Sequence, residues 1–268
     1  MVAFAANSVF CRLALREPAN DPVSFTLLRL FSGAVVLSFF LLKYRKSSPL
    51  TWDRKTLLGP LLLFSYALFF SLSYVIIDAG TGALILFASV QLTMMTFALV
   101  SGHRLTLKEL LGMTLAITGF IWLLLPGATM PAPGAAGLMV LSGVSWGFYS
   151  LLGQGSANPI FITSRNFVGT LPLVLLLILT FPYQLTREGA GWAVLSGAVT
   201  SGLGYVLWYI VLRELSTSSA AIVQLSVPAI AALGGVLFLA EAIDMRLVVA
   251  SILIFSGIIL KVKAADVS

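Results

Sequence analysis

The sequence predicts an all-α, polytopic membrane protein of ten transmembrane helices, and two observations carry this prediction. Of the 268 residues, 59% are apolar and only 10% are charged, whereas an ordinary soluble domain has about 25% charged residues. So few polar residues cannot cover the surface of a soluble fold of this size. The apolar residues also form long unbroken runs and do not alternate with polar ones, which favours helices over a transmembrane β-barrel.

Clusters of charged residues, proline and glycine separate the predicted helices. A crossing takes about 20 residues, and the spans are 1–15, 22–42, 57–77, 80–101, 106–125, 133–152, 159–180, 190–211, 217–240 and 246–262. The connections leave no room for a soluble domain, so the whole chain is predicted to be one membrane domain. The first span is short and has neither a basic leader nor a cleavage site, so it does not resemble a signal peptide. We expect the natural chain to extend further at its N-terminus.

The basic residues gather on one side of the membrane when the helices alternate. Ten of the 16 lie on that side, namely Lys43, Arg45, Lys46, Arg54, Lys55, Arg104, Lys108, Arg213, Lys261 and Lys263. Only Arg12, Arg16, Arg187 and Arg246 lie on the opposite side. Since short cytoplasmic loops are rich in Lys and Arg, both termini are predicted to be cytoplasmic. The net charge of +6 therefore reflects topology and not a nucleic-acid surface.

The two halves of the sequence resemble each other at offsets of 137 and 138 residues. The matched stretches are 21–26 with 158–163, 102–106 with 240–244, and 118–119 with 256–257. The first repeat is therefore predicted over residues 1–130 and the second over 131–268, with five helices in each. Because five is an odd number, the halves have opposite orientations in the membrane. Inverted repeats of this kind are typical of alternating-access transporters.

Several passages carry a resemblance to a known family. They are 21–29, 145–150, 155–159, 201–209 and 228–241. On these the chain resembles the EamA family of the drug/metabolite transporter superfamily over essentially its whole length, and in the second half it is similar to the bacterial aromatic amino acid exporters. The resemblance implies export of amino acids of the aromatic, methionine or threonine type across the bacterial inner membrane. One departure is His103, which stands where the second half keeps the family's glutamate, Glu241.

Two arginines are predicted to lie within spans. The helical rise puts Arg29 about 12 Å and Arg165 about 10 Å from the nearer membrane face. Either guanidinium could bind a substrate carboxylate through its two-pronged fork. The alternative is a structural role, in which the side chain pairs with a carbonyl or an acid or extends to the lipid headgroups, and the modest depth of both residues favours it.

The acidic residues argue against obligatory proton coupling. None of the ten Asp and Glu residues falls at the middle of a predicted span, and the single histidine, His103, lies at a helix end. Proton-coupled carriers hold a carboxylate or a histidine deep in the membrane. We therefore expect facilitated diffusion or exchange. A carrier of another small metabolite and a proton-coupled antiporter are the alternatives.

Aromatic and polar residues inside the spans are the predicted substrate-binding residues. They are Tyr74, Gln91, Ser145, Trp146, Tyr149, Tyr205, Trp208 and Gln224. Trp and Tyr offer a flat apolar body and attract an ammonium group with their ring faces, which suits an amino acid with an apolar side chain. The alternative is an interfacial aromatic belt. That alternative explains residues near span ends, such as Trp192, better than the mid-span Trp146 and Tyr205.

Pro228 is predicted in the middle of the span 217–240. A proline there frees the carbonyl of Gln224 from its helical hydrogen bond, which creates either a hinge beside the substrate or a kink that only shapes the helix.

Other classes of membrane protein lack support in the sequence. An embedded enzyme needs a metal or nucleophile motif, and Cys11 and His103 are far apart in the chain. A channel needs a repeated filter or a ring of charge. We therefore expect a carrier and not an enzyme, with no metal or other cofactor. It is expected to work as a monomer in the lipid bilayer on a small-molecule substrate, without nucleic acid.

Overall fold

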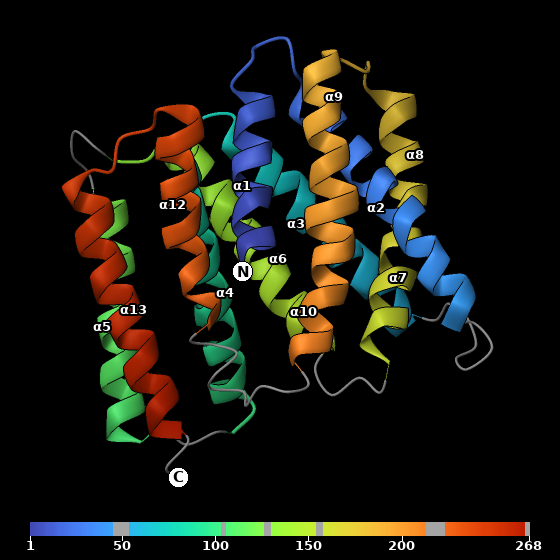
Figure 1. The fold of residues 1–268 in the computed structure, drawn as a ribbon. Coiled ribbons are helices and arrows are strands. Elements are labelled where there is room, and N and C mark those ends of the chain that lie inside the picture. The colour runs from blue at the N-terminus through green and yellow to red at the C-terminus, as the bar shows by residue number, and fades with distance from the viewer. Residues whose placement is uncertain (45–53, 103–105, 126–129, 154–157, 213–222, 266–268) are drawn as a thin grey trace.

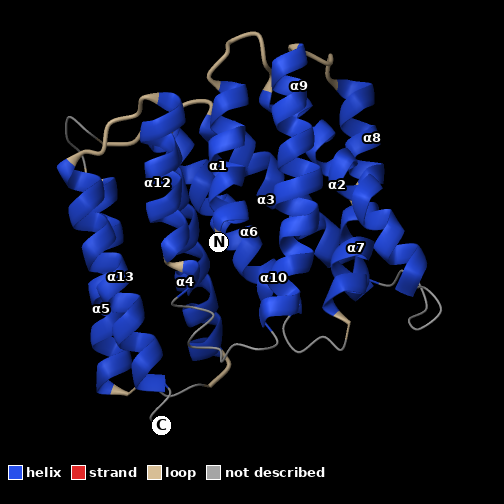
Figure 2. Ribbon diagram, in the orientation of Figure 1, coloured by secondary structure: helices blue, strands red, loops and turns tan. Residues whose placement is uncertain are grey.

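The computed structural model describes residues 1–44, 54–102, 106–125, 130–153, 158–212 and 223–265, which are helical throughout apart from short turns (Figure 2). No strand occurs in these ranges, which confirms the all-helical prediction. The elements are α1 (Val2–Leu15), α2 (Pro22–Tyr44), α3 (Arg54–Tyr74), α4 (Ala79–Val100), α5 (Leu107–Leu124), α6 (Pro133–Gly153), α7 (Pro159–Gly169), α8 (Leu171–Thr180), α9 (Arg187–Val194), η1 (Leu195–Leu203), α10 (Gly204–Leu212), α12 (Ser226–Leu239) and α13 (Met245–Ala265).

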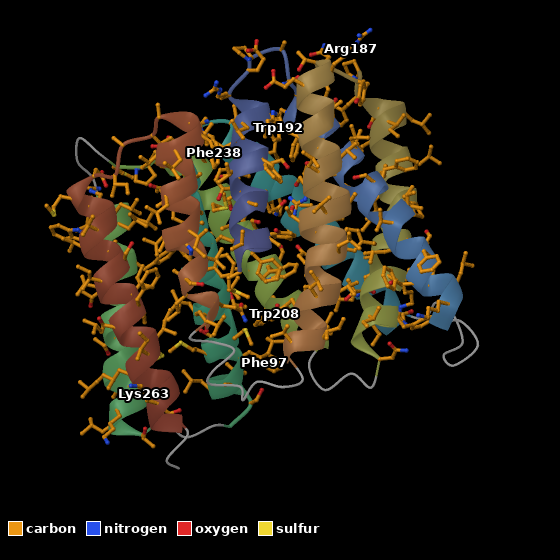
Figure 3. All side chains as sticks on the ribbon, in the orientation of Figure 1. Phe97, Arg187, Trp192, Trp208, Phe238 and Lys263 are labelled. Carbon is orange, nitrogen blue, oxygen red and sulfur yellow. The ribbon has the colours of Figure 1, made fainter. Side chains whose placement is uncertain are left out.

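The lengths of the helices fit a bilayer. Within the described ranges, seven helical segments are long and apolar enough to cross a membrane, and three shorter apolar helices accompany them: Val2–Leu15, Ser226–Leu239 and Met245–Leu260. Large apolar side chains such as Phe97 and Phe238 are exposed on the outside of the bundle (Figure 3), where lipid is the solvent that suits them. The chain is therefore a multi-pass membrane protein, while its ten-helix inverted plan stays a prediction.

Two predicted spans are less regular than their hydropathy indicates. The segment 159–180 is divided into α7 and α8 at Thr170, because Pro172 lacks an N–H and its ring collides with the preceding turn. The segment that begins at Arg187 continues through the π-helix η1 into α10. Gly197 of η1 lies so close to α2 that a Cβ there would be 2.0 Å from the carbonyl oxygen of Arg29.

The N-terminal caps at matched positions of the two halves are similar. The side chain of Asp21 accepts a hydrogen bond in the first turn of α2, and the side chain of Asn158 accepts one in the first turn of α7. Thr106 and Asp244 do the same for α5 and α13. Each cap satisfies a backbone N–H that the helix itself leaves without a partner. Asp21 and Asn158 therefore mark the starts of α2 and α7.

Helices α5 and α13 pack against each other at one side of the bundle (Figure 1). Gly119 of α5 and Gly257 of α13 are matched positions of the two halves, and each faces the other helix. A Cβ on Gly119 would be 2.7 Å from the Cβ of Leu253, and one on Gly257 would be 2.5 Å from the carbonyl oxygen of Gly112. This reciprocal packing of matched positions agrees with the inverted repeat, which stays a prediction.

Candidate functional site

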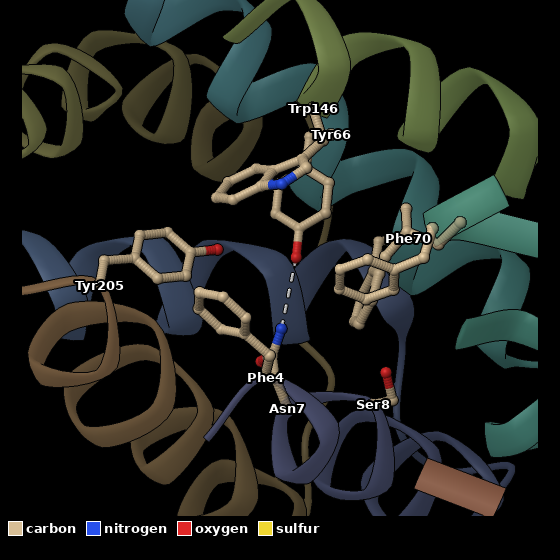
Figure 4. Close-up of a pocket in the computed structure, with 9 residues that line it drawn as sticks. Phe4, Asn7, Ser8, Tyr66, Phe70, Trp146 and Tyr205 are labelled. Atoms are coloured by element: carbon tan, nitrogen blue, oxygen red, sulfur yellow. Dashed lines mark hydrogen bonds between the residues drawn. The ribbon is translucent and has the colours of Figure 1, made fainter. Parts of the chain in front are cut away.

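A small cavity lies where α1, α3, α4, α6 and α10 meet, and both halves of the chain contribute to its wall. Its lining residues are Phe4, Asn7, Ser8, Tyr66, Phe70, Leu86, Phe87, Trp146 and Tyr205 (Figure 4). Helix α1 begins at mid-height in the bundle (Figure 1), which brings its first two turns to this centre. The cavity volume is about 20 Å³, enough for a single water molecule. In this conformation the site is therefore tightly packed and has no room for an amino acid.

Aromatic rings make up most of the cavity wall. The ring of Trp146 lies 4.7 Å from that of Tyr66 and 5.0 Å from that of Tyr205, between centroids. Phe4 meets Tyr205 edge-on at 5.5 Å. Tilted and edge-on pairs at these distances stabilise the arrangement beyond the burial of their surface. The wall therefore offers several ring faces and edges to a small guest.

Polar groups on one side of the cavity form a network centred on Asn7. Its Nδ2 donates to the Tyr66 hydroxyl at 3.4 Å, the bond drawn in Figure 4. Its Oδ1 accepts from the Ser196 hydroxyl at 2.5 Å and from the Thr200 hydroxyl at 3.4 Å. The network thus joins α1 to α3 and to η1. A buried amide with partners on both ends fixes its neighbours in one arrangement.

Arg29 of α2 extends this network behind the cavity wall. Its side chain is 1% exposed. The Nη2 atom donates to the Tyr66 hydroxyl at 3.1 Å and Nε to the Ser201 hydroxyl at 3.3 Å. The guanidinium also lies over the rings of Tyr66 and Phe70, 5.3 Å and 4.8 Å from their centroids. Nη1 has no hydrogen-bond partner, and no carboxylate among the described residues forms an ion pair with Arg29.

Four of the predicted site residues gather at this cavity. Trp146 and Tyr205 line it directly. Tyr149 stacks on Trp146 at 5.2 Å, and Trp208 meets Phe4 edge-on at 6.0 Å. All four belong to the second half of the chain. Trp146 contacts Tyr149 and Tyr205 directly, and Phe4 joins Trp208 to Tyr205.

The other predicted site residues do not line the cavity, and among them the ring of Tyr74 meets that of the lining residue Phe70 edge-on at 4.6 Å. Tyr74 is fully buried, and its hydroxyl donates to the carbonyl of Ala79 at 3.3 Å. Ser145 donates to the carbonyl of Leu141 in its own helix. Gln91, Gln224 and Arg165 are half-buried and do not line the cavity. The sequence does not reveal on which side of its helix each of these residues lies.

Pro228 lies in the first turn of α12 and not in the middle of a helix. A turn at Leu225 interrupts the helix just before it. A proline is tolerated in a first turn because the N–H that it lacks would have no helical partner there. Residues 217–222 of the predicted span lie outside the described residues, so the hinge at Pro228 stays a prediction.

The residues that α1 and α3 supply to the cavity were not among those predicted from the sequence. Asn7 and Ser8 interrupt an apolar run, and Tyr66 stands within the span predicted over 57–77. A polar side chain inside a span was the signal that could have found them. Phe4 and Phe70 carried no comparable signal, because a phenylalanine in a membrane helix faces lipid as readily as a cavity.

One end of the bundle is held by charged groups. Arg12 of α1 donates to Glu241 at 3.1 Å and to the carbonyls of Tyr74 and Val75, and it lies 3.4 Å from Asp78. The second oxygen of Glu241 accepts from the backbone N–H of Ala79 at 2.8 Å. Burial raises the pKa of Glu241 above its ordinary value, against the opposing effects of that backbone bond and of Arg12. This cluster ties α1, the α3–α4 turn and the α12–α13 loop together.

A second hollow of about 440 Å³ opens on the outside between α4, α5 and α6. Its lining is mostly apolar, and the hydroxyl of Thr93 donates to a carbonyl of its own helix. Such a surface suits lipid chains. The central cavity is therefore the better candidate for a substrate site.

Comparisons with known proteins agree with these observations. The sequence profile of the EamA-like transporter family matches residues 1–125 and 134–262. The uncharacterized protein PA1977 of Pseudomonas aeruginosa is 49% identical over 262 residues, which are 97% of this chain and 91% of that protein. The uncharacterized transporter YoaV of Bacillus subtilis is 24% identical, over 92% of this chain and 89% of its own length.

A solved structure supports the fold. A protein crystal structure matches 99% of this chain and 97% of its own chain with a TM-score of 0.68 and 20% sequence identity. At this identity the match bears on the arrangement of the helices alone. The two segments matched by the family profile meet at the central cavity, because Phe4, Tyr66 and Phe87 come from the first and Trp146 and Tyr205 from the second.

Proposed function

Because this chain belongs to the EamA-like transporter family, we propose that it exports amino acids with apolar or aromatic side chains across the bacterial inner membrane, through the central cavity. The family makes the chain a transporter, and the choice of substrate rests on the chemistry of the cavity. The single observation that carries it is a wall of six aromatic rings beside the Asn7 amide.

The cavity wall matches the parts of such a substrate. Tyr and Trp rings accept an apolar side chain, and their faces attract an ammonium group. The amide of Asn7 and the hydroxyl of Tyr66 supply hydrogen bonds at one side. A pocket of apolar walls with a few fixed polar groups is the usual form of a small-molecule site.

Alternating access is the transport mechanism that suits this arrangement. The cavity is small and lies between the two halves, and the Arg12–Glu241 cluster holds one end of the bundle. Release of that cluster on one side, and of the contacts at the other end of the bundle, would expose the cavity to each side in turn. Arg187 and Lys263 lie at opposite ends (Figure 3), and we assign the end with Lys263 to the cytoplasm on the positive-inside rule.

Facilitated diffusion or exchange is the proposed energetic mode. The described residues that line the cavity include neither a carboxylate nor a histidine, the groups through which proton-coupled carriers work. We further propose that one chain suffices, because both halves of a single chain contribute to the cavity wall.

Counterflow in proteoliposomes tests the proposal. Vesicles loaded with unlabelled L-phenylalanine, L-methionine or L-threonine should take up the labelled amino acid transiently, with saturation and trans-stimulation. Linear flux without either property would indicate a channel. No counterflow of any amino acid would overturn the substrate assignment, and accumulation driven by a pH gradient alone would overturn the uncoupled mode.

A further inference from the structure

We propose that Arg29 is the residue that binds the carboxylate group of the substrate and so restricts transport to carboxylate-bearing molecules. The inference rests on the proposed function, since it concerns the same cavity, and it names the charge that the cavity selects. It starts from an imbalance: the centre of the bundle holds a fully buried cation, and nothing among the described residues neutralises it.

A buried guanidinium without an anionic partner is costly. The guanidinium ion has lost its contact with water, and neutral hydroxyls and ring faces replace only part of the lost hydration energy. Arg29 has two hydroxyl partners, Tyr66 and Ser201, and an Nη1 atom with no partner at all. A carboxylate would neutralise the positive charge of Arg29 and would also accept a hydrogen bond from Nη1, because its oxygens are anionic acceptors that fit the guanidinium.

The guanidinium lies one side chain away from the cavity. Tyr66 belongs to the cavity wall, and its hydroxyl accepts from Arg29 on one side and from Asn7 on the other. The Asn7 bond is long, at 3.4 Å, and is the weaker of the two. A shift of the Tyr66 ring away from Asn7 would connect the guanidinium with the cavity, and a carboxylate could then reach Nη1.

The π-helix η1 supports this arrangement. It places Ser201 at the Nε atom of Arg29 and brings Gly197 against the backbone of the same residue. π-Helical turns are rare and occur often at functional sites. Because η1 holds Ser201 at Nε and Tyr66 binds Nη2, Nη1 is the guanidinium nitrogen that is left for a ligand.

The consequence is selection by charge. Amino acids and simple monocarboxylates bind, whereas the amides and amines of the same shape lack the group that neutralises Arg29. A hydrogen bond to a charged partner contributes enough to make the acid bind roughly 10- to 100-fold more tightly than its amide.

Thermal unfolding of the purified protein in detergent tests the proposal with matched ligand pairs. The pairs are phenylacetate with phenylacetamide, and L-phenylalanine with L-phenylalaninamide. In the wild-type protein, half of the maximal rise in Tm should need at least about tenfold less acid than amide. Arg29→Gln should abolish this preference, and Arg29→Lys should keep part of it, because a lysine retains the charge but not the fork.

The control is Arg187→Gln, which removes an exposed arginine at the end of the bundle and should leave the preference intact. Should Arg29→Gln fail to fold, Arg29→Lys still reports, because it should raise the acid concentration needed for half of the maximal rise in Tm. Equal stabilisation by acid and amide in the wild type, or an unchanged preference in a folded Arg29 variant, would overturn the inference.

Two outcomes separate this inference from the proposed function. If phenylacetate stabilises the protein in an Arg29-dependent manner but no amino acid shows counterflow, the carboxylate site holds and the amino acid assignment falls. If L-phenylalanine shows counterflow and Arg29→Lys still prefers it to its amide as strongly as the wild type does, the amino acid assignment holds and the site falls.

Discussion

At the scale of single residues, Trp146 holds the aromatic wall together, since its ring contacts those of Tyr66, Tyr149 and Tyr205. Trp146→Ala should lower the apparent affinity for L-phenylalanine about tenfold, the effect of one or two lost ring contacts. Half-saturation in counterflow measures it. Trp192→Ala is the control, because Trp192 stacks on Phe10 away from the cavity. Equal affinities in both variants would place the substrate elsewhere.

Asn7 is the centre of the hydrogen-bond network on the polar side of the cavity. Asn7→Leu removes the acceptor of the Ser196 and Thr200 hydroxyls and the donor to Tyr66. Because the Ser196 hydroxyl then remains buried without its partner, we expect the free energy of unfolding to fall by about 1–3 kcal/mol. Denaturant unfolding in detergent measures the change. Thr180→Val, at an exposed hydroxyl on α8, should leave the stability unchanged, and a similar loss in both variants would contradict a central role of Asn7.

Glu241, in the charged cluster at one end of the bundle, should make the stability of the fold depend on pH. Its pKa is raised above the ordinary 4.5 by burial and by Asp78, while the Ala79 N–H and Arg12 act in the opposite direction. A carboxyl with a raised pKa in the folded state stabilises the fold fully below pH 4.5, and this contribution is lost as the pH rises through the raised value. The Tm of the wild type, measured against that of Glu241→Gln, should therefore fall from acid towards neutral pH. A difference in Tm between the two proteins that stays constant over this pH range would contradict the raised pKa of Glu241.

Comparison of prediction and structure at the residue scale shows where sequence reasoning fails. The helical rise gives the depth of a residue, so Trp146 and Tyr205 were expected at mid-span, and they line the cavity. The side of a helix that faces the centre depends on packing angles that hydropathy does not reveal. For this reason Gln91 and Gln224 were predicted at the cavity and lie away from it, and Tyr66 was missed.

At the scale of elements, the pair formed by α5 and α13 depends on two glycines. A Cβ on Gly257 would be 2.5–2.6 Å from backbone atoms of Gly112 and Ala116, so Gly257→Ala should separate the helices at a cost of about 1–3 kcal/mol. Gly137→Ala is the matched control, because nothing lies within 4 Å of that position. Its stability should be unchanged or slightly raised. Thermal unfolding of both variants measures the difference, and an equal effect would contradict the close packing.

The bounds of the elements were largely predictable, because charged residues, prolines and capping side chains mark the ends of helices in the sequence. Breaks inside spans were harder to foresee. The interruption at Thr170 follows from Pro172, whose local effect the hydropathy pattern conceals. The π-helix η1 depends on its contact with α2 through Gly197, which is a tertiary effect.

At the scale of the whole molecule, the composition predicted a helical membrane protein, and the family match and the seven long apolar helical segments of the described ranges agree. The inverted repeat remains a prediction supported by the matched caps and by the reciprocal packing of Gly119 and Gly257. The position of the site between the two halves could be predicted from the sequence. The lining residues of α1 could not, because α1 reaches the centre only through the packing of the complete bundle.

The most direct test of transport through the central cavity uses the single cysteine of the chain, Cys11. In a Cys11→Ala background, Ser8→Cys puts a small reactive group on the cavity wall. Alternating access predicts that membrane-impermeant thiol reagents modify Ser8→Cys from either side of the membrane, and that L-phenylalanine slows the modification. Reaction from one side only, or modification that L-phenylalanine does not affect, would contradict alternating access through this cavity.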